Sequence, residues 1–596
     1  MKRGTLLIAL VVLCVMGNAA CGSSHHHTPP PIPTSNFVFY AAGTDSFGLT
    51  YSIAGVVQIT ADGNNTILGG VQDFNDGAAP PDGIGTSPTT GDAILPQSTD
   101  GSVVSTLVFS SDGSGNATLT LVTNNPALGV PEGAAGSVVG VETFALSFAN
   151  ASHALIAEFD GTATSLGSYD LQTLPSAPIA STSFSFTAAG VDANGDPTAE
   201  GGVFSLDSSG NVTSSVDIND GGVVTLANPA SVGTLIPASD TFGRGTVTGS
   251  LDGTPAVVNF YIVNSEVIRL IDVDTTDTAV GSAYGQGASA GTVTNAFIGT
   301  SVFSVAGVDD LVLYNAVGQF TTVPAEADAK PKANLRGVHP NGQLTLGTFA
   351  GIADVNETVD GGPLAPEAAF NGTYSFDSNG DGRGNFTFSA GPTDDIAVFG
   401  VYAVDPTLNI LDPNNPPSTT PPTSPALLVE LDANLIGNGL LLPQPATPAV
   451  TDIAADVAFG AQANTTTEAG TAEFELLGSL ATDAGSVAGE GFIDDPAGIL
   501  NGTSFGDSGA IFSGTFTDDG EAIGRYTSGS GGFLAMSPLN DGEQFGFTVT
   551  AYDANGNQLF WIDMDTDTTW GGPIEASTFT VPVDDKAPAK PKNKKQ

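Results

Sequence analysis

Short apolar runs of Val, Ile, Phe, Thr and Ala recur along the chain, separated by Gly, Asn and Asp at intervals of about 8–12 residues. Helical periodicity is nearly absent. Between 183 and 287 the runs are joined by tight turns such as Asn194-Gly195, which favour a meander of successive antiparallel strands. Eight or nine meandering strands bury their edges best in a closed barrel. The pattern therefore predicts an all-β protein built from up-and-down barrels, with a two-sheet sandwich as the alternative.

Sequence markers repeat along the chain in a fixed order. An aromatic run opens three segments, an Asp-x-Asn motif follows it, and a Gly-Arg or similar pair precedes a later strand. The markers are Phe39–Asp45, Phe186–Asp192 and Phe303–Asp309; Asp73/Asn75, Asp217/Asn219 and Asp354/Asn356; and Arg244, Arg383 and Arg525. We expect four tandem β-meander domains at 36–173, 183–287, 288–444 and 450–582, of which the fourth is the most diverged.

The third domain carries two interruptions that the others lack. They are Ala325–Arg336, which contains three basic residues, and the Pro-rich Asp412–Pro425. Long loops on a rigid scaffold often carry binding residues. A dedicated partner, if the protein has one, is expected here, and a tolerated insertion without a partner is the default interpretation.

A closing marker is the most regular of the repeats. An acid-x-Asp pair is followed seven residues later by Gly, and in the first three domains by Gln five residues further on. The pairs are Glu158/Asp160, Asp272/Asp274, Glu430/Asp432 and Asp563/Asp565; the glycines are Gly167, Gly281, Gly439 and Gly572; the glutamines are Gln172, Gln286 and Gln444.

The acid pairs have three possible roles. Alternate residues of a strand share a face, so we expect Ile271 and Val273 to face the core and Asp272 and Asp274 to face away from it. Two carboxylates on one face suit Ca²⁺ binding or acid–base cleavage of a glycoside. Because a catalytic pair is rarely copied into every domain, we favour a solvated face that keeps the β-rich surface soluble.

Asx-rich loops form a second candidate Ca²⁺ site. Asp192, Asn194 and Asp196, and then Asp377, Asn379 and Asp381, match the pattern D-x-N-x-[DN]. The second loop continues with Gly382, as in the first half of an EF-hand loop. Phe388 stands where that loop would place its bidentate Glu. Asn-Gly between strands is also a strong hairpin signal, so we expect turns here. No cofactor is expected, and Ca²⁺ remains possible.

The N-terminus indicates export. Lys2 and Arg3 precede the apolar run Leu6–Met16, which is too short to span a bilayer and predicts a signal peptide over 1–21. Its end, Ala19-Ala20-Cys21, resembles the lipobox of bacterial lipoproteins, although Asn18 departs from the aliphatic residue usual there. The resemblance implies that Cys21 carries a diacylglycerol that anchors the protein in a membrane. Ordinary secretion is the alternative.

Both ends of the chain are expected to lie outside the domains. Residues 22–35 have the composition of a Ser/His/Pro tether, and residues 583–596 are expected to form a basic, disordered tail with five lysines. The whole chain has 63 acidic and 14 basic residues and a net charge of −49. Such a surface repels a phosphate backbone, so nucleic-acid binding is excluded.

No nucleophile–base constellation is evident in the sequence. Outside the tether the histidines are His153 and His339, and the tryptophans Trp561 and Trp570 are candidates for a sugar-binding patch. We therefore expect a lipid-anchored, surface-exposed, non-enzymatic structural, adhesion or binding protein of the bacterial envelope, at the outer membrane or cell surface. Its partners would be the membrane and an envelope polymer or surface ligand. The alternatives are a barrel that binds a small ligand and, less favoured, an acid-pair glycoside hydrolase.

Overall fold

The computed structural model describes residues 34–579, apart from gaps in the connections, of which 78–89, 129–138, 288–298, 325–343 and 445–455 are the longest. The predicted signal peptide, Cys21, most of the tether, the basic loop Ala325–Arg336 and the basic tail lie outside the described residues. Every described element is a β-strand. None of the described residues forms a helix with the length and hydrophobicity needed to cross a membrane.

The strands form four antiparallel sheets, named barrels 1 to 4 in chain order. Barrel 1 comprises β1 (Thr34–Asp45), β2 (Thr50–Thr60), β3 (Ile67–Asn75), β4 (Asp92–Leu95), β5 (Thr106–Phe109), β6 (Asn116–Thr123), β7 (Gly140–Asn150), β8 (His153–Glu158) and β9 (Ala163–Leu171). Barrel 2 comprises β10 (Ser183–Val191), β11 (Pro197–Leu206), β12 (Asn211–Asp220), β13 (Val223–Asn228), β14 (Val232–Pro237), β15 (Arg244–Leu251), β16 (Thr254–Ile262), β17 (Val267–Asp272) and β18 (Thr278–Gly285).

The second half of the chain repeats this plan. Barrel 3 comprises β19 (Thr300–Asp309), β20 (Val312–Pro324), β21 (Leu344–Asn356), β22 (Leu364–Phe376), β23 (Arg383–Ala390), β24 (Val398–Ala403), β25 (Ala426–Glu430) and β26 (Leu435–Gln444). Barrel 4 comprises β27 (Asp456–Thr467), β28 (Gly470–Asp483), β29 (Ser486–Asp495), β30 (Phe505–Asp518), β31 (Arg525–Ser537), β32 (Glu543–Phe547), β33 (Val549–Asp553), β34 (Gln558–Asp563) and β35 (Thr569–Ala576).

Each sheet closes on itself, because its first strand pairs with its last and a further pairing joins the remaining two ends. Barrel 3 is a closed ring of β19 to β26 in chain order. The closing pairs elsewhere are β4–β6, β11–β12 and β30–β31, while β5, β13 and β32 are additional edge strands. The prediction of all-β meander domains folded as up-and-down barrels is therefore confirmed, and the sandwich alternative is excluded.

Aromatic side chains fill the barrel interiors. In barrel 3, Phe320, Phe349 and Phe386 pack with ring centroids 5.1–5.6 Å apart, two of the three pairs edge to face. Trp561 and Trp570 pack edge to face at 5.0 Å in barrel 4, and both are fully buried. An exposed sugar-binding patch at these tryptophans is therefore excluded. Such pairs add to the stabilisation from apolar burial.

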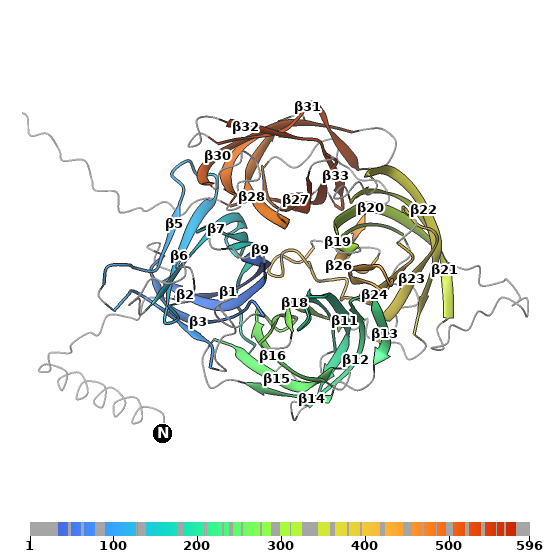
Figure 1. Cartoon of the computed structure of the whole chain (residues 1–596), viewed down its shortest axis with the longest axis horizontal. Coiled ribbons are helices and arrows are strands. Elements are labelled where there is room, and N and C mark those ends of the chain that lie inside the picture. Colours follow the sequence, from blue (N-terminus) through green and yellow to red (C-terminus); the bar gives the residue numbers. More distant parts are fainter. Residues whose placement is uncertain are drawn as a thin grey trace, which may run out of the picture.

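The opposite strand faces are also apolar, because the barrels pack against one another. One shared core contains residues of all four barrels, among them Val38, Val280, Val302 and Ile562. Figure 1 shows the barrels arranged around a central axis, with barrel 4 next to barrel 1 and the first and last strands of the barrels closest to the axis. The chain thus forms a closed ring of four barrels.

The closing-marker glycines lie on these inner strands. A Cβ at Gly167, Gly281, Gly439 or Gly572 would lie 1.8–2.1 Å from a carbonyl oxygen of the adjacent strand. No larger residue fits such a backbone approach, which explains why the spacing from the acid pair to glycine is kept four times.

Candidate functional site

An Asp–Arg–Tyr joint connects consecutive barrels. Between barrels 1 and 2, Arg244 donates from Nε and Nη2 to the two oxygens of Asp73, each at 2.8 Å, and the Tyr261 hydroxyl donates to the same carboxylate at 2.5 Å. All three side chains are buried. Charge-assisted hydrogen bonds are stronger than neutral ones, and a bidentate Arg–carboxylate pair also fixes the relative orientation of the two side chains.

The same joint recurs twice. Asp217 of barrel 2 accepts from Arg383 and Tyr402 of barrel 3, and Asp354 of barrel 3 accepts from Arg525 and Tyr552 of barrel 4. The second and third sequence markers are therefore two halves of one contact between neighbouring barrels. Sequence reasoning identified both halves but missed their pairing and the tyrosines.

Buried amides complete these joints. Asn219 donates to the carbonyl oxygens of Glu430, Asp432 and Leu435, 2.7–3.1 Å away, in the acid-pair turn of the next barrel. Asn75 and Asn356 bind the corresponding turns. The marker glutamines also connect each barrel to the next one in the chain. Gln172, Gln286 and Gln444 each donate to a backbone carbonyl of the following barrel.

The contact between barrels 4 and 1, named the seam here, has different chemistry. Strand registers place Asn116 and Ser147 of barrel 1 where barrel 2 has Arg244 and Tyr261, and they place Phe492 of barrel 4 where barrel 1 has Asp73. Asn116 and Ser147 donate across the seam to the Glu490 and Gly478 carbonyl oxygens, each at 2.7 Å. Beside these bonds, Phe492 packs edge to face on Phe159 with a centroid distance of 5.2 Å.

The segment after β35 closes the ring as the linkers do between other barrels. Ser577 and Thr578 donate to the carbonyl oxygens of Phe148 and Ala149 in barrel 1, at 3.0 and 2.7 Å. Gln172 and Thr173 make the corresponding bonds from barrel 1 to barrel 2. Phe579 then stacks on Phe148 at 4.9 Å.

The acid pairs lie at these contacts. The first members Glu158, Asp272, Glu430 and Asp563 are all buried, whereas Asp160, Asp432 and Asp565 are half-buried and Asp274 lies outside the described residues. The expected solvated face is therefore wrong for the first members. Ile271 belongs to the core shared between barrels, so the face assumed to be the barrel interior packs against neighbouring barrels instead.

Acidic side chains of barrels 1 and 4 gather at the seam. Asp494 stands where barrel 1 has Asn75, and burial together with Asp160 and Asp495 raises its pKa to about 8. Burial and the nearby acids, Asp160 first, raise the pKa of Glu158 well above its usual value. Within barrel 1, burial likewise raises the pKa of Glu142, which is bonded to Gln72, to about 8. These carboxyls are accommodated in their neutral form.

The Asx loops form hairpin turns. Asp192 accepts hydrogen bonds from the backbone N–H groups of Asn194 and Asp196 and from the Asn194 side chain, each at 2.8 Å. In the second loop, Asp377 accepts from Arg383 at 2.7 Å, Asp381 accepts from the Arg383 backbone at 3.0 Å, and Asn379 lies outside the described residues. Within the described ranges, no three His, Cys, Asp or Glu side chains are grouped as metal ligands. We therefore favour turns over Ca²⁺ sites, and melting with and without Ca²⁺ tests that choice.

A buried polar network lies near the ring axis and connects three barrels. His153 of barrel 1 contacts Asp170 through Nδ1 at 2.7 Å and Glu575 of barrel 4 through Nε2 at 3.0 Å. Arg269 of barrel 2 donates to Asp170 at 2.6 Å and lies over the Tyr40 ring at 4.5 Å.

The charges in this network stabilise one another. Burial alone would raise the pKa of Asp170, but Arg269 and His153 lower it to about 2. Burial lowers the pKa of His153, yet Glu575 and Asp170 outweigh it and raise that pKa well above its usual value. The network therefore holds two cations against carboxylates.

This network is no catalytic triad. Ser168 donates to Asp170 at 2.7 Å rather than to His153, and both His153 nitrogens face carboxylates. A nucleophilic serine needs a neutral base within hydrogen-bond reach, and His153 does not supply one here.

The Pro-rich insertion reaches the ring axis. Residues 404–417, named the axial loop, include the start of this insertion. The axial loop runs through the centre of the ring in Figure 1. Residues of the other three barrels hold it: Asn150 donates to Asp412 at 2.6 Å, Tyr284 to the Ile410 carbonyl at 3.0 Å, and Gln558 to Asn409 at 2.6 Å. The described part of the insertion therefore binds the ring itself.

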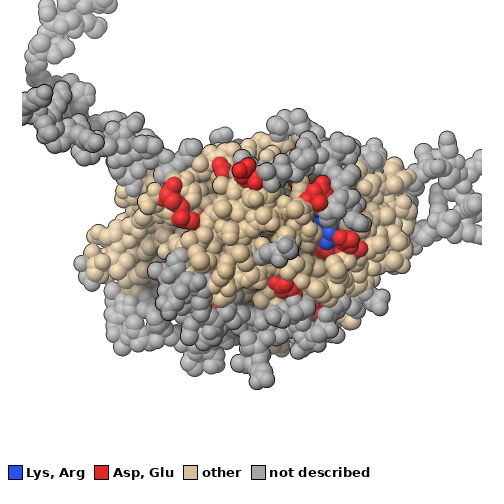
Figure 2. Space-filling model, turned by 90° about the horizontal axis from the view of Figure 1, so that it is seen from above, with Lys and Arg blue, Asp and Glu red and all other residues tan. Residues whose placement is uncertain are grey.

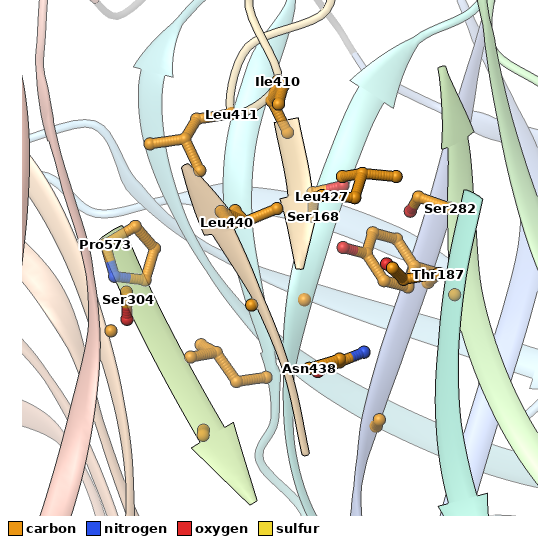
Figure 3. Close-up of a pocket in the computed structure, with 18 of the residues that line it drawn as sticks. Ser168, Thr187, Ser282, Ser304, Ile410, Leu411, Leu427, Asn438, Leu440 and Pro573 are labelled. Carbon is orange, nitrogen blue, oxygen red and sulfur yellow. The ribbon is translucent and has the colours of Figure 1, made fainter. Parts of the chain in front are cut away.

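A cavity of about 340 Å³, named the axial pocket, lies beside this loop and is lined by all four barrels. Figure 3 shows Ile410 and Leu411 of the axial loop at one end, with Asn438, Thr187 and Ser304 among the side chains around the space. All four closing-marker glycines line it.

Comparison with known proteins does not assign a family. No protein-family model matches the chain, and no curated protein matches it. Solved structures with some likeness include a mutant of the vaccine antigen transferrin binding protein B from Haemophilus parasuis, with 10% identity, 71% of this chain and 83% of that chain covered, and a TM-score of 0.18.

Two further structures are similarly distant. Transferrin binding protein B from Neisseria meningitidis has 10% identity, covers 78% of this chain and 87% of its own, and gives a TM-score of 0.15. A putative AttH from Nitrosomonas europaea has 9% identity, covers 44% of this chain and 96% of its own, and gives a TM-score of 0.16. Scores this low carry no argument about activity.

Proposed function

We propose that this chain is a non-enzymatic protein of the bacterial envelope, anchored through lipid on Cys21, whose ring of barrels is a rigid platform for a surface ligand or an envelope polymer. The observation that supports this proposal most is that the buried charged side chains connect the barrels to one another. The four arginines of the described residues are all buried, and each pairs with an aspartate of the preceding barrel.

The surface charge fits the same role. Because those arginines are buried, the exposed charges of the described residues are acidic. On the face shown in Figure 2, the acidic side chains lie in separate small groups, one of them beside a basic side chain, and most of the described surface between them is uncharged. A dispersed acidic surface keeps a β-rich protein soluble at the cell surface.

A turnover screen tests the absence of enzymatic activity. Purified protein is expected to leave glycans, esters and peptides unchanged. Robust activity that is lost in Asp563→Asn at an unchanged melting temperature, and kept in the exposed control Asp483→Asn, would establish the acid-pair hydrolase instead.

Detergent partition tests the anchor. The protein expressed with its own N-terminus is expected to enter the detergent phase of Triton X-114, because a diacylated cysteine binds bilayers stably. Cys21→Ser is expected to move it to the aqueous phase. Equal partition of both proteins would favour ordinary secretion.

A further inference from the structure

The axial pocket has the size and lining of a small-molecule site. Its volume, about 340 Å³, falls within the range of such sites, which are mostly apolar with a few placed polar groups. Leucine and valine side chains form much of the wall, including Leu166 of barrel 1, Val280 of barrel 2 and Leu440 of barrel 3. This space differs from the barrel interiors, where aromatic side chains pack together.

Several polar groups of the wall have no partner. Thr187, Ser304 and Asn438 make no side-chain hydrogen bond to any other described residue. Arg269 is fully buried, and its Nε–H meets no acceptor in the described part of the chain. A buried donor without an acceptor destabilises a folded protein. An oxygen placed in the pocket would instead bind the Thr187, Ser304 or Asn438 side chains, which line it.

The pocket offers no free charge. Arg269 is already paired with Asp170 at 2.6 Å, and His153 lies between Asp170 and Glu575. An ionised ligand would therefore be buried without a counter-charge, which is strongly unfavourable. An uncharged ligand avoids this penalty.

We infer that the axial pocket binds a small uncharged molecule that is mostly apolar and carries one hydrogen-bonding oxygen, such as a medium-chain alcohol or ketone. The apolar part contacts the leucine and valine wall, and the oxygen binds the Thr187, Ser304 or Asn438 side chains. This inference rests on the binding part of the proposed function.

The uncharged fluorophore N-phenyl-1-naphthylamine is the probe for this site. Its emission is expected to rise on addition of the full mature protein, because the probe leaves water for an apolar wall. Competition then tests the ligand class: 1-decanol is expected to displace the probe at concentrations at least tenfold lower than decanoate or decylamine.

Two matched variants locate the site. Ala306 lines the pocket from β19, so Ala306→Trp is expected to abolish probe binding. Val323 lies on β20 of the same barrel and is 57% exposed, so Val323→Trp is expected to leave binding unchanged. Thr187→Val keeps the side-chain shape but removes the hydroxyl, and it is expected to weaken displacement by 1-decanol about tenfold.

The outcomes separate this inference from the proposed function. Probe binding that survives Ala306→Trp, or decanoate that competes as well as 1-decanol, would overturn the inference. Absence of probe binding in a folded wild-type protein would also overturn it, while leaving the structural role intact. Enzymatic turnover would contradict the proposed function whether or not the probe binds.

Discussion

At the scale of single residues, the Asp–Arg–Tyr joints concentrate the ring's electrostatic energy in a few side chains. Asp217, Arg383 and Tyr402 are all buried, so each depends on the others to offset the loss of hydration. Removing one partner of a buried ion pair destabilises the folded protein much more than removing both, because the remaining charge is buried without a partner.

Substitution at Arg383 tests this dependence. Arg383→Gln is expected to lower the free energy of unfolding by about 3–5 kcal/mol, because Asp217 loses its bidentate partner. The double variant Asp217→Asn/Arg383→Gln is expected to be more stable than the single one. Thermal melting followed by circular dichroism measures the order, with the exposed Asp483→Asn as a control. A double variant less stable than Arg383→Gln would contradict the account.

The Asx turns make a prediction about metal ions. The carboxylate of Asp192 already accepts three hydrogen bonds within its own turn, and Ca²⁺ would have to displace them. We therefore expect melting curves in millimolar Ca²⁺ and in EDTA to coincide. A shift of several degrees that disappears in Asp192→Asn would establish a Ca²⁺ site instead.

At the scale of strands and loops, the seam gives the ring a weak point. Three contacts between barrels contain an arginine. The fourth places Glu158 and Asp160 of barrel 1 near Glu475 and Asp494 of barrel 4. The carboxyls whose pKa is raised bind protons in the folded state that they would release on unfolding near neutral pH. The contribution of these carboxyls to the free energy of unfolding is therefore greatest below about pH 5, and it falls as the pH rises toward 8.

The other shifted groups set the shape of the full profile. His153, with its raised pKa, also contributes stability that is lost as pH rises through its folded-state pKa. Asp170, whose pKa is lowered to about 2, contributes stability that is present above pH 4 and lost as pH falls toward 2. The expected melting temperature therefore peaks near pH 5 and declines toward pH 8.5.

Asp494→Asn tests the role of the seam in this decline. The change restores the amide found at Asn75, Asn219 and Asn356 in the other contacts, and it is expected to raise the melting temperature at pH 8.5 more than at pH 5. Asp483→Asn removes the same charge from an exposed turn of the same barrel and is expected to have little effect. Equal shifts for both variants would show that net charge alone is responsible.

The strand pattern predicted the barrels but not their packing. Alternation identifies two faces of a strand, and in this ring both faces are apolar, because Ile268 lies in the interior of barrel 2 and Ile271 in the core between barrels. When a neighbouring barrel rather than water covers the outer face of a strand, the sequence pattern alone does not distinguish the barrel interior from the core between barrels. The acids were therefore assigned to solvent although their first members are buried.

The joints left a signal in the sequence that local reasoning did not use. The Asp-x-Asn marker occurs in the first three domains and the Arg marker in the last three. That offset by one domain is what contacts between consecutive barrels produce. The pairs lie 166–171 residues apart, which is too far for any local pattern, and the axial pocket exists only once four barrels surround it.

At the scale of the whole molecule, the central claim is that four barrels form one closed ring. The ring is completed by the seam and by the segment after β35, which binds barrel 1 through Ser577, Thr578 and Phe579. Without these contacts the ring would be open between barrels 1 and 4, and only the three Asp–Arg–Tyr joints and the shared core would fix the barrels relative to one another.

Pulsed electron paramagnetic resonance measures ring closure directly. Spin labels at Val108→Cys in barrel 1 and Ala481→Cys in barrel 4, both exposed positions, are introduced in a Cys21→Ser background that leaves no other thiol in the mature chain. The closed ring predicts a single narrow distance distribution that broadens only in urea. A broad distribution in native buffer would show independent barrels and would contradict the account.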